Sequence, residues 1–362
     1  MRWAVYLAMA TLGFGQETTP EDAGVVIRST TSLVQVRVVA KDAKGRPVAD
    51  LRREDFQVQD DRKPQPITLF TADRGALPAS SATIPSTGES AETPQEAGSY
   101  SLILLDWLNT LYADRLRAKD QVIRLFKSFQ PSRRVAIYLL GNEPRLLHDF
   151  TSDMAELVQV VEETELEWGD LDNDTPGRFD ARFGSRTGPR PGLEEQLFFM
   201  NKRVTESFRA LELISDRLVH VPGRKSLIWM SDAFPLVVDN NVIPGAHPLE
   251  LVYYQNLERL LARLNRADIA VYGVDAHGLA TTAGSYPGTM VQFAERTGGT
   301  AFYGRNDLDT GVRLALEDMR VSYILGFHVP PGAAPGIHEI RVRVSRSGVT
   351  LRYRESYELA ER

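Results

Sequence analysis

The sequence predicts an α/β domain inserted into a β-sandwich. Between residues 99 and 320, short apolar runs alternate with segments whose apolar residues recur at helical spacing. This alternation is typical of a doubly wound, mostly parallel sheet covered by helices. Both ends of the chain instead carry the alternating pattern of strands. A lone hairpin is only marginally stable in water, so we expect the N- and C-terminal strands to form one sandwich.

The N-terminal region divides into three segments. Residues 1–15 contain one basic residue, Arg2, then a short apolar run and small residues near Gly15. This pattern predicts a signal peptide that is cleaved near Gly15. Residues 24–72 alternate apolar and polar side chains, as in Val34, Val36 and Val38, and are expected to form strands. Residues 75–98 contain prolines and small polar residues and no aromatic residue, which predicts a flexible linker.

The α/β domain is expected at residues 99–320, and residues 321–358 are expected to complete the sandwich. Buried strands are predicted at "SLILLD", "RRVAIYLLG", "KSLIWMSD" and "IAVYGVD". The helix after the second of these is expected to take Ser152 as its N-cap. The C-terminal hairpin carries arginines that we interpret as a solvated outer face, with an anionic surface as the alternative: Arg341, Arg343, Arg352 and Arg354.

Composition excludes several classes of function. A formal net charge of −6 argues against a nucleic-acid-binding protein. The chain has no cysteine, which excludes thiolate zinc sites, iron–sulfur clusters and a lipoprotein anchor. After the predicted signal peptide, no segment is apolar and long enough to span a membrane. The sequence motifs of zinc proteases, α/β-hydrolases and phosphate-binding loops are absent.

Three aspartates follow predicted buried strands: Asp106 in "LILLDWLNT", Asp232 in "LIWMSDAFP" and Asp275 in "VYGVDAHG". In an open α/β sheet, ligands bind outside the carboxyl ends of the strands. Carboxylates are the ligands that hard cations prefer, so these residues predict a metal or ligand site. The alternative is that Asp106 and Asp232 only cap the helices that follow.

Several long motifs resemble the von Willebrand factor A group, specifically the VWFA-related secreted proteins of Acidobacteria. The motifs are "VRVVAKDAKGRPVADLRREDFQVQDD", "LILLDWLNT", "VPGRKSLIWMSDAFP", "ERTGGTAFYGRNDLDTGVRLALEDMRVSYILGFHVP" and "HEIRVRVSRSGVTLRYRESY". The resemblance covers nearly the whole chain. It implies a Rossmann-like A domain between the two halves of the sandwich.

The resemblance also implies a metal-ion-dependent adhesion site. The positions that match its pattern are Asp106, Thr110, Thr205 and Asp232. Leu108 stands at the first serine position and cannot ligate, so the site is degenerate; Asn109 lies beside it and is expected to compensate only if the loop bends differently. The implied cofactor is one divalent cation, Mg²⁺, Mn²⁺ or Ca²⁺, and weak or absent binding is the alternative.

Two further motifs resemble parts of other classes of site. "DWLNT" is similar to the loop of haloacid-dehalogenase-like phosphatases, with Asp106 as nucleophile and Lys225 and Asp232 as helpers, but their general acid is Leu108 here. The acidic segment 162–177 contains aspartates with the spacing of a calcium loop and lacks that loop's glycine and glutamate. We interpret it as a solvated loop available for partner contact.

The expected function is that of an exported, non-catalytic binding or adhesion-type protein, periplasmic or secreted. Its loop rim would contact a protein ligand, with an open position on the cation accepting a carboxylate. The alternative is a structural component of the cell envelope with neither metal nor ligand. The sequence does not specify the partner or the oligomeric state.

Overall fold

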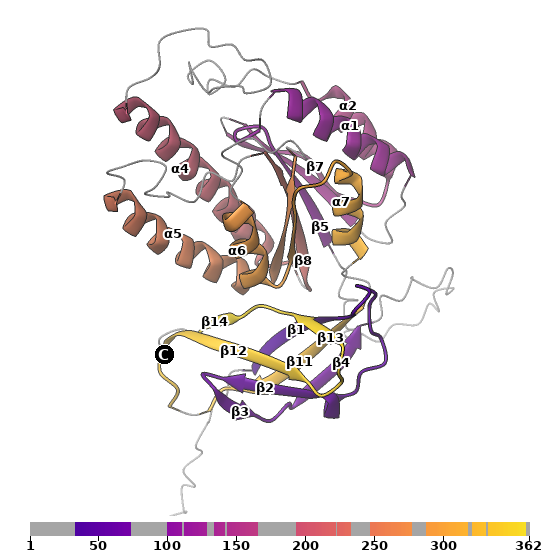
Figure 1. The fold of residues 1–362 in the computed structure, drawn as a ribbon, viewed down its shortest axis with the longest axis vertical. Helices are drawn as coiled ribbons and strands as arrows, with labels where there is room; N and C mark the ends of the chain where they lie inside the picture. Colours follow the sequence, from indigo (N-terminus) through magenta and orange to yellow (C-terminus); the bar gives the residue numbers. More distant parts are fainter. Residues whose placement is uncertain are drawn as a thin grey trace, which may run out of the picture.

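The computed structural model consists of an α/β domain and a β-sandwich that lie against each other (Figure 1). It describes residues 33–73, 100–165, 193–317 and 321–359, apart from 111, 129–133, 142, 222, 233–246, 277–286 and 331. The signal peptide at 1–15, the linker at 75–98 and residues 166–177 of the acidic segment lie outside the described residues. The first two residues of the acidic segment, Glu162 and Glu163, end a helix, so the predicted loop begins later than expected.

A six-stranded sheet forms the centre of the α/β domain. Its strands are β5 (Tyr100–Asp106), β6 (Arg134–Leu140), β7 (Pro144–Thr151), β8 (Lys225–Ser231), β9 (Ile269–Asp275) and β10 (Thr300–Phe302). They lie in the order β10-β9-β8-β5-β6-β7, and each neighbouring pair is parallel except β6 and the edge strand β7. Because this is the strand order of a doubly wound fold, the predicted fold class is confirmed.

Helices cover both faces of this sheet (Figure 1). One face packs against α1 (Tyr112–Ser128), α2 (Met154–Glu163) and α7 (Leu308–Glu317). The other packs against α4 (Leu193–Leu218), α5 (His247–Arg266) and α6 (Pro287–Thr297). Since both faces are covered, every residue of β8 and β9 is buried. Strands buried on both faces read as continuous apolar runs rather than as alternating ones.

The sandwich joins the two ends of the chain. Its strands are β1 (Leu33–Asp42), β2 (Phe56–Asp60), β3 (Lys63–Gln65), β4 (Leu69–Asp73), β11 (Ser322–His328), β12 (Gly336–Val344), β13 (Val349–Arg352) and β14 (Ser356–Leu359). One sheet has the order β13-β1-β11-β4 and the other β14-β12-β2-β3. Each sheet therefore combines N- and C-terminal strands, which confirms the insertion of the α/β domain into the sandwich.

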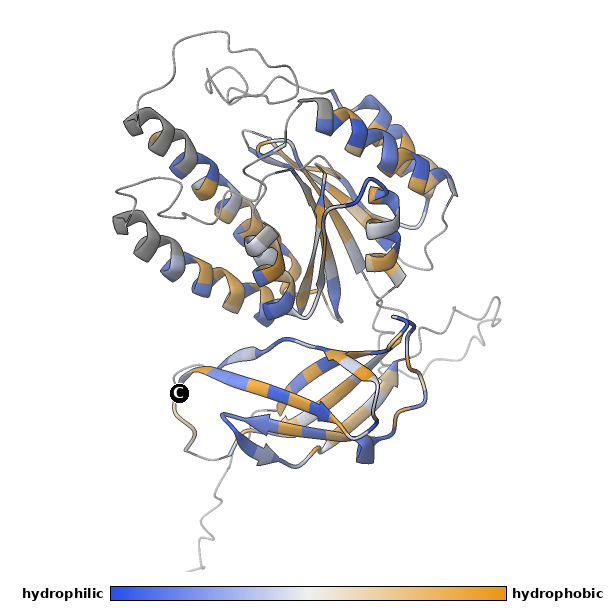
Figure 2. Cartoon of the chain, in the orientation of Figure 1, coloured by the Kyte–Doolittle hydropathy of each residue, from blue (hydrophilic) through white to orange (hydrophobic). Residues whose placement is uncertain are grey.

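Alternation along β1 buries one face of the strand between the two sheets. Val34, Val36 and Val38 are buried, whereas Gln35 is exposed, as the sequence predicts. Hydrophobic and hydrophilic residues alternate along the strands of the sandwich (Figure 2), and buried apolar residues of both sheets form one core cluster. At the centre lies Tyr323, whose hydroxyl donates to the carbonyl of Val48 and accepts from the amide of Leu51, at 2.8 and 3.1 Å. A buried tyrosine hydroxyl with both partners costs little to desolvate.

Arginines connect the sandwich to the α/β domain. Arg354 donates from its two terminal nitrogens to the carbonyls of Asn265 in α5 and Gln35 in β1, both at 2.7 Å. Arg352 bonds to the hydroxyl of Thr300 in β10. The prediction of an exposed arginine face is therefore wrong for these two residues. The reason is that the edge formed by β13 and β14 packs against the α/β domain, which the sequence pattern does not reveal.

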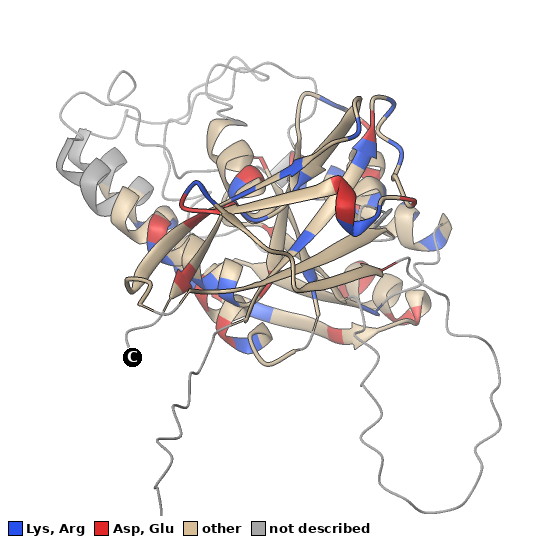
Figure 3. Cartoon of the chain, turned by 90° about the horizontal axis from the view of Figure 1, so that it is seen from below, with Lys and Arg blue, Asp and Glu red and all other residues tan. Residues whose placement is uncertain are grey.

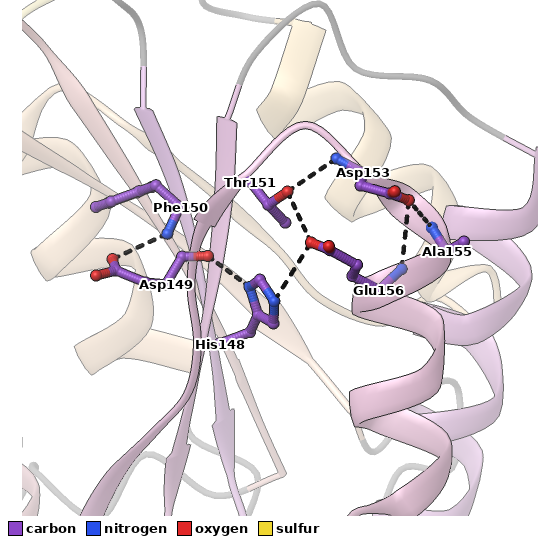
Figure 4. Close-up of polar contacts among 7 residues, drawn as sticks. All are labelled: His148, Asp149, Phe150, Thr151, Asp153, Ala155 and Glu156. Atoms are coloured by element: carbon purple, nitrogen blue, oxygen red, sulfur yellow. Dashed lines mark hydrogen bonds and ion pairs between the residues drawn. The ribbon is translucent and has the colours of Figure 1, made fainter.

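The start of α2 corrects a second expectation. Asp153, not Ser152, is the N-cap, because its carboxylate accepts from the amides of Ala155 and Glu156 at 2.8 and 3.4 Å (Figure 4). Thr151 supports the turn: its hydroxyl accepts from the amide of Asp153 and donates to Glu156. A carboxylate one position further along the chain serves as an N-cap better than the serine, since it also favours the positive end of the helix dipole.

Charges of the two signs are interspersed on the molecule. Figure 3, which views it from the sandwich side, shows Lys and Arg among Asp and Glu along the strands and helices. The totals are also similar, with 42 basic and 48 acidic residues. A face of mixed charge lacks the basic stripe of a nucleic-acid-binding domain.

Candidate functional site

The candidate site lies where the strand order of the sheet reverses. That point is between β5 and β8, whose carboxyl ends carry Asp106 and, one residue past β8, Asp232. Asp275 ends β9 and is the register partner of Ser231. The three aspartates are 0 to 5% exposed. The structure thus brings all three to the edge of the sheet where ligands of doubly wound folds bind.

Nitrogen donors surround the carboxylate of Asp106. Its Oδ1 accepts from the backbone amide and the side-chain amide of Asn109, at 3.0 and 3.1 Å. Its Oδ2 accepts from the same side-chain amide at 2.9 Å and from the indole nitrogen of Trp229 at 2.9 Å. The bond from the backbone amide of Asn109 closes a local turn ahead of α1, which begins at Tyr112, so it is not an N-cap of that helix.

The side-chain amide of Asn109 joins two elements that are far apart in the sequence. Besides Asp106, its Nδ2 contacts the hydroxyl of Ser207 on α4 at 2.9 Å. Asn109 is 1% exposed and Ser207 fully buried. The amide therefore bridges a carboxylate and a hydroxyl, as a cation does in the adhesion-type site that the resemblance implies. Asn109 does contribute to the site, but through its nitrogen rather than through an oxygen.

Burial and hydrogen bonding act in opposite directions on Asp106. Complete burial is the larger effect and raises the pKa of its carboxyl above the ordinary value, because a charge is disfavoured away from water. The bonds from Asn109, Trp229 and Ser231 favour the charged form and lower the pKa in part. Without these donors, an isolated buried carboxylate would be strongly destabilising.

Thr110 and Asp232 meet through a different contact. The hydroxyl of Thr110 accepts from the backbone amide of Asp232 at 3.1 Å, which ties the β5 loop to the end of β8. The carbonyl of Thr110 accepts from Nε of Arg115 at 2.7 Å, and Arg115 is 1% exposed. The loop between β5 and α1 is thus held on two sides.

Thr205 is placed differently from the other three predicted ligands. It lies on the exposed side of α4, and its hydroxyl donates to the carbonyl of Asn201 one turn earlier, at 2.8 Å. The residue of α4 that reaches the Asp106 group is Ser207, two positions further on. Sequence reasoning missed Ser207 because two positions separate the exposed and buried sides of a helix, and the exact start of α4 could not be read from the pattern.

Alanine variants of these two residues should differ in stability. Ser207→Ala is expected to lower the free energy of unfolding by about 1–3 kcal/mol, because it removes a buried partner of Asn109. Thr205→Ala is expected to change it by less than about 0.5 kcal/mol, because Thr205 is exposed and alanine favours a helix. Urea denaturation of both variants measures the difference. Equal losses would contradict the assignment of Ser207 to the site.

The donors present do not fit a divalent cation at Asp106. A cation needs oxygen lone pairs, and both oxygens of Asp106 accept from nitrogens instead. Asn109 Oδ1 is buried and has no hydrogen-bond partner among the described residues. The oxygen of Asn109 alone does not make a cation site, because the neighbouring carboxylate of Asp106 already accepts hydrogen bonds on both of its oxygens. Cation binding by Asp106, Thr110, Thr205 and Asp232 therefore remains a prediction, and the hydrogen bonds around Asp106 disfavour it.

The phosphatase alternative meets a steric obstacle. A nucleophilic carboxylate must reach the phosphorus atom of its substrate. Asp106 has no exposed surface, and Asn109 and Trp229 hold it in place. Lys225, proposed as a helper, lies at the opposite end of β8 and donates to the carbonyl of Val221.

Comparisons with known proteins give similarity at the level of structure. No family model and no curated protein matches the chain. Solved structures that match include an aerotolerance-related membrane protein of Bacteroides fragilis, 10% identical over 61% of this chain and 100% of that one, with a TM-score of 0.38. BatB of Bacteroides thetaiotaomicron is 14% identical over 61% and 97%, with a TM-score of 0.36.

A third match is a von Willebrand factor type A protein of Catenulispora acidiphila, 9% identical over 73% of this chain and 67% of that one, with a TM-score of 0.35. The chain is similar to von Willebrand factor A domain proteins. At such identities and TM-scores, the similarity carries no statement about activity, ligand or partner.

Among the described residues, no helix is both long and apolar enough to cross a membrane.

Proposed function

We propose that this protein is an exported, non-catalytic binding protein of the adhesion type. Its partner, most simply another protein, docks on the loops at the carboxyl edge of the six-stranded sheet. The observation that carries the proposal is the locked group of Asp106, Asn109, Trp229 and Ser207 at the point where the strand order reverses. It fixes this edge of the sheet without offering a reactive side chain.

The lengths of the connections at this edge support a binding role. The chain leaves β8 at Ser231 and enters α5 at His247; it leaves β9 at Asp275 and enters α6 at Pro287. Connections from strand to helix in α/β folds usually take two to six residues. Longer connections positioned by a rigid sheet are where binding residues concentrate.

We further propose that partner binding does not depend on a cation at Asp106. In an adhesion-type site the cation completes its coordination with a carboxylate of the partner. Here the Asn109 amide occupies the bridging position between Asp106 and Ser207. The rim would then bind through side chains of its connections, and the Asp106 group would support them.

Capture from an envelope extract tests this function, with the full chain as bait. One variant replaces residues 233–246 by a Gly-Ser linker at the carboxyl edge. Its matched control replaces residues 129–133, which connect α1 to β6 at the opposite edge. We expect the control and the native chain to retain the same partner, with or without a chelator, and the first variant to lose it.

Two results would contradict the proposed binding function, and a third would contradict its independence of a cation. Capture that survives replacement of 233–246 would remove the carboxyl edge from the binding surface. Self-association of the native chain with no other partner, measured by sedimentation, would favour the alternative of a structural envelope component. Capture abolished by the chelator alone would instead support the cation at Asp106, Thr110, Thr205 and Asp232.

A further inference from the structure

A second cluster of possible metal ligands lies in the sandwich, on strands that belong to opposite ends of the chain. Asp60 ends β2, Asp61 follows it in the hairpin turn to β3, and His338 lies on β12. Their ligand atoms all lie within 4.8 Å of one another. Asp60 and His338 are 5% and 7% exposed, whereas Asp61 is exposed on the outer side.

The hydrogen bond of His338 determines which ring nitrogen faces this cluster. Its Nε2 lies 2.8 Å from the carbonyl of Ala334. A carbonyl only accepts, so Nε2 carries the hydrogen, and in the neutral imidazole Nδ1 carries the lone pair. Metal-bound histidines characteristically donate their second ring nitrogen to a carbonyl or carboxylate in this way, which fixes the tautomer and the orientation of the ring.

The lone pair on Nδ1 points at two carboxylates. Nδ1 lies 2.9 Å from an oxygen of Asp61 and 3.4 Å from Oδ1 of Asp60. Both Nδ1 and Asp60 Oδ1 are buried and have no hydrogen bond among the described residues. With Nδ1 unprotonated, three groups rich in electrons, two of them in the interior, converge without a donor between them; with Nδ1 protonated, the same two contacts are ion pairs. Either a proton on Nδ1 or a metal ion at the centre removes the repulsion between these groups, and only the metal ion uses the lone pair of Nδ1 as a ligand.

The spacing of these atoms fits coordination of a single ion. Metal–ligand bonds of about 2.0–2.2 Å place neighbouring ligand atoms roughly 3.0–3.5 Å apart. The two distances from Nδ1 lie at or next to that range. The exposed side of Asp61 leaves room for water to complete the coordination.

The carboxylates are oriented by outer contacts, as those of metal sites are. Asp60 Oδ2 accepts from the hydroxyl of Tyr357 at 3.1 Å, and the ring of Tyr357 stacks on that of His338 at 5.0 Å between centroids. Asp61 Oδ1 accepts from the amide of Glu339 at 2.9 Å. Each carboxylate thus keeps one oxygen bonded to the protein and the other directed at His338.

The hairpin turn supplies Asp61 at an unusual backbone conformation. Asp61 and Arg62 have φ of 45° and 67°, the positive values that a two-residue type I′ turn requires. Aspartate tolerates this region, whereas arginine does so only at a cost. The turn places Asp61 next to β12, where its amide also donates to the carbonyl of Glu339 at 2.9 Å.

We propose that Asp60, Asp61 and His338 bind one first-row transition-metal ion, represented by Zn²⁺, which fastens the β2–β3 hairpin to β12. The imidazole ligand favours such an ion over Mg²⁺ or Ca²⁺, whose preferred ligands are all oxygens. The site is separate from Asp106: it lies in the sandwich and uses the sandwich's own strands. It does not depend on the proposed partner binding.

Titration of the full chain with Zn²⁺ tests the site, using metal-free protein without a polyhistidine tag. We expect one ion per chain by calorimetry and elemental analysis, and a higher Tm with Zn²⁺. Mg²⁺ and Ca²⁺ should bind at least 10-fold more weakly. His338→Gln should weaken Zn²⁺ binding at least 100-fold, and Tyr357→Phe, which removes an outer contact, by 10- to 100-fold.

His148→Gln is the matched control. His148 also has an acidic neighbour, with Nε2 3.5 Å from Glu156 Oε2, but it lies on β7 in the other domain (Figure 4). This variant should bind Zn²⁺ as the native chain does. If His338→Gln fails to fold, Asp61→Asn replaces it, since Asp61 is exposed, and at least 10-fold weaker binding is expected. No binding by the native chain, or unchanged affinity in the His338 or Asp61 variant, would overturn the proposal.

Discussion

Replacing Asn109 with aspartate is expected to lower the free energy of unfolding by about 3–5 kcal/mol, the cost of leaving a buried charge without its partner. The substitution keeps the size and shape of the side chain. It removes the amide that donates to Asp106 and Ser207, and it places a second carboxylate beside a fully buried one. Two carboxylates that close together disfavour each other's ionisation.

A divalent cation should restore much of that loss. Asp106, Ser207 and the new carboxylate would supply the oxygen ligands that Mg²⁺ and Mn²⁺ prefer. A ligand that binds only the folded state at 100 times its Kd adds about 2.7 kcal/mol. We therefore expect the urea midpoint of Asn109→Asp to rise with Mg²⁺ or Mn²⁺ and to fall with a chelator.

Asn109→Ala is the control for this experiment. It removes the donor without adding a charge, so it should be destabilised and should not respond to Mg²⁺ or Mn²⁺. His338→Gln in both backgrounds removes any contribution of the sandwich site. If the native chain gains as much stability from Mg²⁺ as Asn109→Asp does, the cation already binds beside Asn109 and the cation-free interpretation is wrong.

Gly298→Ala is expected to destabilise the protein by about 2–4 kcal/mol, because two costs add. Gly298 follows the last residue of α6 with φ of 77°, a left-handed conformation that disfavours a side chain. A Cβ there would also lie 2.7 Å from the carbonyl carbon of Tyr353 in the sandwich. The backbone at Gly298 is also held in place, since Arg224 donates to the carbonyl of Gly298 at 2.7 Å.

Gly304→Ala separates these two costs. Gly304 also has a positive φ, 63°, but no atom lies within 4 Å of the position its Cβ would take. It should lose only about 1–2 kcal/mol, the cost of the left-handed conformation. Denaturation gives both values, and hydrogen exchange at Tyr353 and Arg354 should quicken only in Gly298→Ala. Equal losses and unchanged exchange would show that the domain contact at Gly298 is not tight.

The sequence predicted the fold well because periodicity reports burial. Val34, Val36 and Val38 alternate because β1 has one buried face, and "LIWM" does not alternate because β8 has two. The carboxyl ends of parallel strands share one edge, so the position of Asp106, Asp232 and Asp275 on that edge also followed from the pattern. The alternation along a strand and the shared edge of parallel strands both follow from backbone geometry, which does not depend on individual side-chain contacts.

The details of the site depended on individual side-chain bonds, which periodicity does not report. Trp229 belongs to an apolar run that predicts a buried strand, and its indole nitrogen donates to Asp106. The sequence predicts that Asn109 compensates for Leu108 only if the loop bends differently, whereas the direction of its amide depends on Ser207, which is distant in the sequence. Likewise, His338 and Asp60 are brought together only by the pairing of β12 with β2.

The pairing of β1 with β11 has a consequence for synthesis of the chain. Val36 and Leu325 are register partners, and the whole α/β domain is translated between them. At about 5–20 residues per second, the ribosome needs roughly 15–60 s to supply the second partner. During that time β1 and β2 carry apolar residues and open edges, which are prone to aggregation. We expect the N-terminal strands of the sandwich to need a chaperone until β11 emerges from the ribosome. We also expect the α/β domain to fold before the sandwich does.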